Sequence, residues 1–180
     1  SYYQDRDSGM LRAMVASPSP PRVILLGKAL AGVVIGSAQA LALVGVAALT
    51  PGIDLQWQYG LVPGLLLAGA AVLLLAVFLN GFAQLVASRI RTMQGFHLVM
   101  NLVLFPLLFF SGAFFPLHDL PVWLGVLAAA NPLSYAVDLL RVAVYADGAG
   151  HFTPLVDVMV LGVLGLAVFL LGVGRQPRLE

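Results

Sequence analysis

Cysteine is absent from the 180-residue chain, and charged side chains make up only 9% of it. The first absence excludes disulfides, thiolate chemistry and thiolate metal sites. The second lies far below the roughly 25% that is typical of a soluble domain, while 61% of the residues are hydrophobic. We therefore predict an integral membrane protein. The formal net charge of +1 gives no reason to expect a nucleic-acid partner.

Four apolar runs are each long enough to cross a hydrocarbon core of about 30 Å as a helix. They are Leu25–Leu49, Leu61–Ala87, Phe96–Phe115 and Leu155–Val173. Because lipid offers no hydrogen-bond partner to the backbone, only helices and closed barrels cross it. Runs such as Leu65–Leu67 lack the in–out alternation of barrel strands. The expected fold is one all-α membrane domain, residues 1–180, with four transmembrane helices.

Basic residues fall at alternate ends of these spans. Positive residues mark the cytoplasmic side of a membrane protein, and only Arg141 lies on the other side. The remaining eight are Arg6, Arg12, Arg22, Lys28, Arg89, Arg91, Arg175 and Arg178. This pattern predicts a multi-pass protein of the cell's inner (plasma) membrane, with both ends of this chain in the cytoplasm.

Residues 1–22 form the only sizeable polar segment. We predict that Gln4–Ala16 is a short cytoplasmic helix, although Gly9 weakens it by about 1 kcal/mol relative to alanine. The proline-rich run at 17–21 ends this helix and forms a rigid elbow that leads into the first span. The alternative is an amphipathic helix that lies on the membrane surface.

The segment 116–154 lies outside by the charge count, yet it is largely apolar. A first short helix is expected from about Pro121 to Ala130. A second is expected to run to about Tyr145, with Asn131 as its N-cap and Pro132 in its first turn. Each is too short to cross the membrane. We therefore expect a re-entrant helical hairpin before the last span.

Two charges on the second of these helices, Asp138 and Arg141, are three residues apart. At this spacing the side chains are neighbours and can form an ion pair, which would lower the cost of holding both charges at membrane depth. The alternative is a helical hairpin that lies flat on the outer surface.

The central portions of the four spans hold no Asp, Glu, Lys, Arg or His. Ion-coupled transporters usually bury such residues near the midplane, so any uphill transport here needs an energy source outside this chain. Neutral polar residues in the spans either join helices or line a substrate path. These residues are Gln39, Asn80, Gln84 and Asn101.

No catalytic, cofactor or metal site is predicted. The pair Gly27-Lys28 is similar to the end of a phosphate-binding loop, but Arg22 stands where the first glycine should be, and Ala29 replaces the serine or threonine. None of the three histidines has a second ligand at helical spacing. This chain therefore binds no nucleotide through that motif, and a metal site is not expected.

Residues 5–18, DRDSGMLRAMVASP, are followed by Gly27-Lys28 at the mouth of the first span. Residues 111–117 read SGAFFPL, and residues 131–138 read NPLSYAVD before Leu140-Arg141. Together these stretches resemble the permeases of ATP-binding-cassette (ABC) exporters of the second type. The latter string is similar to that family's outer hairpin before its last span. The resemblance covers essentially the whole chain in the correct order.

Members of this family have six spans, so the resemblance implies that two further spans precede this chain. It also identifies Gln4–Ala16 as the coupling helix that contacts the ATPase. The residues implied in this contact are Asp7, Gly9, Met10, Leu11, Met14, Ser17 and Pro18. The chain departs from the family at Asp7, where glutamate is commoner, and in its more proline-rich elbow.

By this resemblance the protein is the permease subunit of an ATP-driven exporter. It implies a separate ABC ATP-binding subunit, a second permease copy that is identical or different, and surrounding membrane lipid. The apolar spans favour hydrophobic drugs (multidrug efflux) or lipid-like molecules, and a polysaccharide is the other substrate class. A non-transporting scaffold or accessory subunit is an alternative, and it would not need the coupling helix. A secondary transporter is a further alternative, which the uncharged midplane disfavours.

Overall fold

A computed structural model describes residues 21–52, 55–57, 59–90, 92–114, 121–145 and 150–174. The predicted coupling helix lies outside these residues. Over the described ranges the chain forms helices and no strands. The helices are α3 (Pro21–Leu49), α4 (Leu61–Ala87), α5 (Met93–Phe109), α6 (Val122–Ala130), α7 (Pro132–Val144) and α8 (Pro154–Gly174).

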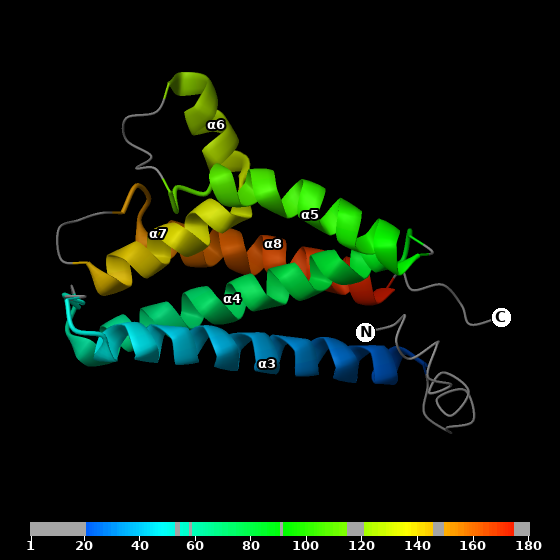
Figure 1. The fold of residues 1–180 in the computed structure, drawn as a ribbon, viewed down its shortest axis with the longest axis horizontal. Coiled ribbons are helices and arrows are strands. Elements are labelled where there is room, and N and C mark those ends of the chain that lie inside the picture. Colours follow the sequence, from blue (N-terminus) through cyan, green and yellow to red (C-terminus); the bar gives the residue numbers. More distant parts are fainter. Residues whose placement is uncertain are drawn as a thin grey trace.

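Helix α4 is the centre of the bundle. It packs most extensively against α8, then against α7 and α3, whereas α5 makes few contacts. Figure 1 shows α3, α4, α5 and α8 running lengthwise, with α6 projecting away from them. The start of α3, the α4–α5 connection and the end of α8 lie at one end of the bundle (right in Figure 1). This is the end at which the sequence places its basic residues.

Among the described residues, three helices are long and apolar enough to cross a membrane: Leu26–Leu49 within α3, all of α4, and Pro154–Gly172 within α8. They agree with the first, second and fourth predicted spans. A fourth crossing is reached only if α6 and α7, which meet at a 90° bend, count as one broken span. The all-helical membrane architecture is thus confirmed, with three to four candidate spans.

The third predicted span, Phe96–Phe115, differs from the structure. Helix α5 has 17 residues, begins at Met93 and ends at Phe109. It begins early because Thr92 is an N-cap whose side chain accepts a hydrogen bond from the Gly95 backbone at 3.2 Å. Beyond its end the chain turns through Gly112, which has a φ of +81°, a conformation that glycine adopts readily. The prediction from the apolar run alone was therefore longer than the helix in the structure.

The two short helices follow the sequence prediction closely. Asn131 is the N-cap of α7, and its side-chain oxygen accepts a hydrogen bond from the Leu133 backbone at 3.0 Å. Pro132 occupies the first turn of α7, where its missing N–H costs nothing. Of the 13 residues of α7, nine are buried, whereas none of α5 is. Helix α7 is therefore packed inside the bundle.

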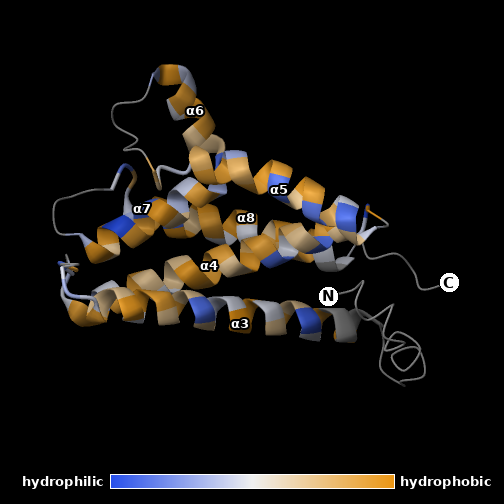
Figure 2. Cartoon of the chain, in the orientation of Figure 1, coloured by the Kyte–Doolittle hydropathy of each residue, from blue (hydrophilic) through white to orange (hydrophobic). Residues whose placement is uncertain are grey.

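The outward faces of the helices are strongly apolar. Figure 2 shows hydrophobic residues over most of the visible surface of α4, α5, α6 and α8. Large side chains such as Leu49 and Val122 are 85% and 86% exposed. A soluble protein rarely exposes contiguous apolar surface of this kind, so these faces fit a lipid environment.

Glycines allow the closest helix contacts. A Cβ on Gly81 of α4 would lie 2.5 Å from the Cα of Phe169 in α8, so the two backbones touch here. In α3 a Cβ on Gly32 would collide with the side chain of Asn80, whereas one on Gly36 would meet nothing within 4 Å. Of these two glycines, Gly32 is therefore the one that lies at a close contact between α3 and α4.

Candidate functional site

One face of α7 carries a polar stripe, which we define as Asn131, Ser134, Asp138 and Arg141. The spacing is i, i+3, i+7 and i+10, which keeps the four residues on one side of a helix. Asn131, Ser134 and Asp138 are 3%, 0% and 3% exposed, and Arg141 is half-buried. Buried polar groups need partners, so the contacts of this stripe show what α7 holds together.

Three residues of the stripe donate hydrogen bonds to the end of α5 or to the turn that follows it. The Asn131 Nδ2 group donates to the Leu107 carbonyl at 2.6 Å, and the Ser134 hydroxyl donates to the Phe110 carbonyl at 3.2 Å. Arg141 Nη2 donates to the carbonyl of Gly112. The last carbonyls of a helix have no partner within it. The polar stripe therefore caps the end of α5 with side chains from a different helix.

Asp138 faces the segment that leads into α8. Its two carboxylate oxygens accept hydrogen bonds from the His151 and Phe152 backbone N–H groups at 2.7 and 2.8 Å. The expected ion pair with Arg141 is therefore not formed. Each of the two side chains bonds to the backbone instead: Asp138 to two N–H groups, and Arg141 to the Gly112 carbonyl. Hydrogen bonds to a charged group are worth about 1.5–3 kcal/mol each.

Asp157, in the first turn of α8, is completely buried, and neither of its side-chain oxygens has a hydrogen-bond partner. A negative charge at a helix start gains about 0.3–1 kcal/mol from the helix dipole. An unpaired buried charge costs several kcal/mol. The cost of burial is therefore larger than the gain from the helix dipole.

Aromatic contacts complete the joint between α6, α7 and α8. The Tyr135 hydroxyl donates to the Ala129 carbonyl of α6 at 2.6 Å. Its ring stacks on that of Phe152 with centroids 4.8 Å apart. Tyr135 thus connects the end of α6 to the segment before α8.

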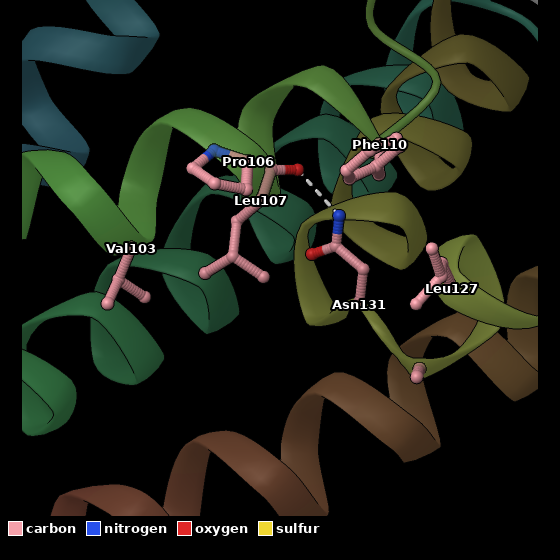
Figure 3. Close-up of a pocket in the computed structure, with 7 residues that line it drawn as sticks. Val103, Pro106, Leu107, Phe110, Leu127 and Asn131 are labelled. Carbon is pink, nitrogen blue, oxygen red and sulfur yellow. Dashed lines mark hydrogen bonds between the residues drawn. The ribbon is translucent and has the colours of Figure 1, made fainter. Parts of the chain in front are cut away.

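A pocket with a volume of about 360 Å³ opens between α5 and α6. Figure 3 shows Asn131 beside it, with its amide nitrogen directed at the Leu107 carbonyl. Its lining residues are Val103, Pro106, Leu107, Phe110, Leu127, Ala130 and Asn131. Asn131 is the one polar side chain in this lining, so the pocket suits an apolar group.

The four neutral polar residues of the spans do not gather around this pocket. Gln39 in α3 and Asn101 in α5 are exposed. Asn80 Nδ2 donates to the Ala76 carbonyl of its own helix at 2.9 Å, and its side chain lies against Gly32. Gln84 is half-buried beside Gly172, with its Oε1 atom unpartnered. The contacts of Asn80 and Gln84 fit a role in joining helices.

Sequence reasoning identified Asn131, Pro132, Asp138 and Arg141 but missed Ser134 and Asp157. The spacing of the polar stripe in an otherwise apolar helix is a signal that could have found Ser134. Asp157 is an acidic residue inside an apolar run, which is itself a signal of function. The proposed ATPase contact residues, from Asp7 to Pro18, lie outside the described residues.

The family model and the curated relatives that match this chain all describe transporters or transport permeases. The family model described as ABC-2 type transporter matches residues 1–145. An Escherichia coli K12 protein named as probable multidrug ABC transporter permease YbhR is 26% identical over 143 residues, which cover 78% of this chain and 37% of that protein. The transport permease ycf38 of Pyropia yezoensis is 34% identical over 157 residues, which cover 83% of this chain and 50% of that protein.

The ycf38 protein of another alga, Porphyra purpurea, is 38% identical over 79 residues, which cover 41% of this chain and 26% of that protein. The chain therefore spans between about a quarter and a half of the length of these relatives. No solved structure matches it.

Proposed function

This chain belongs to the ABC-2 type transporter family as a permease component, and we propose that it exports hydrophobic, drug-like or lipid-like molecules using a separate ATP-binding subunit. The observation that carries the proposal is the family match over residues 1–145. That range includes both the helix-and-elbow segment at the start and the Asn131-Pro132 start of α7. This sequence contains no nucleotide-binding motif, and the proposal assigns ATP hydrolysis to a partner chain.

The helix Gln4–Ala16 is proposed to dock into the ATP-binding subunit and to transmit its closure. The proline run that follows would be stiff, because each proline restricts its own φ and the residue before it. A stiff elbow passes a displacement on to α3 instead of absorbing it. The working unit would contain two permease copies and two ATP-binding subunits in the inner membrane.

The α6–α7 pair is proposed to re-enter the membrane from the outer side and to close the substrate path there. Each helix is too short to cross alone, and the burial of nine residues of α7 supports a position within the bundle over one flat on the membrane surface. The hydrogen bonds from Asn131 and Ser134 to α5 would then transmit movement between this hairpin and the third span.

Co-purification tests the coupling assignment. We expect Leu11→Asp and Met14→Asp to abolish association with the ATP-binding subunit, because each places a charge on the apolar side of the helix, while membrane insertion is unchanged. Ala16→Asp, on the opposite side of the helix from Leu11 and Met14, is the matched control and should retain the partner. Normal recovery of the ATPase with both apolar-side variants would refute the assignment.

Filling the α5–α6 pocket tests the substrate class. In vesicles that hold the permease and its ATPase, Leu107→Trp should reduce ATP-dependent efflux of a hydrophobic fluorescent dye several-fold, because the indole occupies the pocket. Leu102→Trp, on the same helix at a side chain that is 71% exposed, should transport normally. Equal transport by both variants would remove the pocket from the substrate path.

A further inference from the structure

A second pocket lies at the end of the bundle where the sequence places its basic residues. It has a volume of about 480 Å³ and is formed by the last turn of α4, the connection that follows it and the second turn of α5. Its lining residues are Leu85, Val86, Arg89, Ile90 and Val99. Figure 1 shows the α4–α5 connection at the same end as the start of α3 and the end of α8. None of the lining residues belongs to the polar stripe or to the α5–α6 pocket, so this pocket is separate from both.

The lining combines one cation with an otherwise apolar surface. Arg89 is exposed, whereas the four apolar side chains are half-buried. A guanidinium group stays charged at physiological pH, and its planar fork binds pairs of phosphate oxygens. The apolar side chains offer a ligand no hydrogen bond, so they suit a hydrocarbon chain. The pocket therefore fits an amphiphile with an anionic head.

Its place along the helices favours a membrane lipid as that amphiphile. Helix α4 is long and apolar enough to cross a membrane, and Arg89 stands two positions after its last residue, at the level of the lipid headgroups. On α5, Leu98 and Leu102 near Val99 are 70% and 71% exposed, so the surface around the pocket suits acyl chains. Residues 88–92 read SRIRT, with two arginines and no acid. By the charge count this end is cytoplasmic, and the cytoplasmic leaflet contains anionic lipids.

The packing of α5 gives such a lipid a structural role. Helix α5 has 17 residues, none of them buried, and it makes few contacts with α4. At 1.5 Å per residue it is about 25 Å long, which is short of a hydrocarbon core of about 30 Å. Asn131 and Ser134 bind the last residues of α5, whereas this pocket lies near its first turns. An occupant there fills space that the side chains leave between α4 and α5.

We propose that this pocket binds one anionic phospholipid of the cytoplasmic leaflet, with its phosphate on Arg89 and an acyl chain against Val86 and Val99. The bound lipid fixes the cytoplasmic end of α5 against α4. The site requires neither the transported molecule nor an ATP-binding subunit. Its test can therefore fail while the proposed export function stands, and the reverse also holds.

Native mass spectrometry of the whole chain in detergent tests the charge requirement. We expect phosphatidylglycerol to bind more tightly than phosphatidylcholine with the same acyl chains. Arg89→Gln should weaken phosphatidylglycerol binding about tenfold, because the charge-assisted hydrogen bonds to the phosphate are lost. Lys28→Gln is the matched control, since it removes a charge at the same end of the bundle but is not in the pocket lining. Equal affinity of these two variants for phosphatidylglycerol would overturn the proposal.

Filling the pocket tests the place of the acyl chain. Val99→Trp should reduce phosphatidylglycerol binding to the level of phosphatidylcholine, whereas Leu98→Trp, at an exposed side chain, should bind as wild type does. Glycerol phosphate, which has the phosphate but no acyl chain, should not displace the lipid. Unchanged binding by Val99→Trp would show that the lipid lies elsewhere and refute the site. Displacement by glycerol phosphate at concentrations equal to those of the lipid would show a simple anion site and refute it as well.

Thermal denaturation is the second readout, because a ligand that binds only the folded state raises the denaturation midpoint. Phosphatidylglycerol should raise the midpoint of wild type and of Leu98→Trp more than phosphatidylcholine does. Arg89→Gln should abolish this difference between the two lipids. Each variant is its own reference, so a variant that is merely less stable does not imitate this result. An equal effect of the two lipids on wild type would contradict the proposal.

Discussion

Asn131 uses both ends of its side-chain amide. The oxygen caps α7 through the Leu133 N–H group, and the nitrogen binds the Leu107 carbonyl of α5. Loss of an N-cap costs roughly 0.5–2 kcal/mol, and a buried carbonyl left without its donor costs about 1–3 kcal/mol more. We therefore predict that Asn131→Ala lowers the free energy of unfolding by about 2–4 kcal/mol, as measured by denaturation in detergent micelles.

The matched control for the Asn131→Ala prediction is Asn101→Ala, since Asn101 is an exposed asparagine on α5. Exposed substitutions usually change stability by less than about 0.5 kcal/mol. Asn131→Asp separates the two functions of Asn131, because the carboxylate can still cap α7 but cannot donate to Leu107. An Asn131→Ala effect no larger than that of Asn101→Ala would contradict the role given to this side chain.

At the scale of elements, the contact between α4 and α8 depends on glycine. The Cβ that Gly81→Ala introduces would meet the Phe169 backbone, which cannot rotate away as a side chain can. Overpacking of this kind costs about 1–3 kcal/mol, which outweighs the gain of about 1 kcal/mol in helix propensity. We predict that Gly81→Ala lowers the denaturation midpoint.

Gly69→Ala in the same helix is the matched control, because a Cβ there meets nothing within 4 Å. It should keep the propensity gain and raise the midpoint, so the two glycine-to-alanine changes should have opposite signs. Stabilisation by both would show that α4 and α8 do not approach each other at Gly81.

At the scale of the whole molecule, sidedness is the property on which the proposed mechanism depends. The chain contains no cysteine, so single cysteines can be introduced without background. We predict that a membrane-impermeant maleimide labels Gln56→Cys on intact cells but labels Gln94→Cys only after permeabilisation. Gln56 lies in the α3–α4 connection and Gln94 in the first turn of α5, and both are exposed. The reverse pattern would place the proposed coupling helix outside the cell.

Much of the fold could be predicted from local sequence. The first, second and fourth spans agree with α3, α4 and α8 within a few residues, because the length of an apolar run and the caps of a helix are local properties. The N-cap at Asn131 and the proline that follows it were predicted for the same reason. The third span was not bounded correctly, since its end depends on a turn at Gly112 that apolar composition does not reveal.

Less of the candidate site could be predicted. Spacing along α7 placed Asp138 and Arg141 on one face and led to the expectation of an ion pair. Their real partners are backbone groups of residues 151, 152 and 112, which are distant in the sequence. Ser134 and Asp157 were missed because their burial depends on helices that are distant from them in the sequence.

The membrane class, the helical architecture and the expected sidedness could all be predicted from the sequence, because they follow from apolar length and from the placement of basic residues. The packing of the helices was needed to show that α7 lies inside the bundle, that its polar stripe caps α5, and that Asp157 is buried without a hydrogen-bond partner. The physical reason is that a buried polar group takes whichever partner the packed helices bring within reach, and spacing along one helix cannot specify that partner.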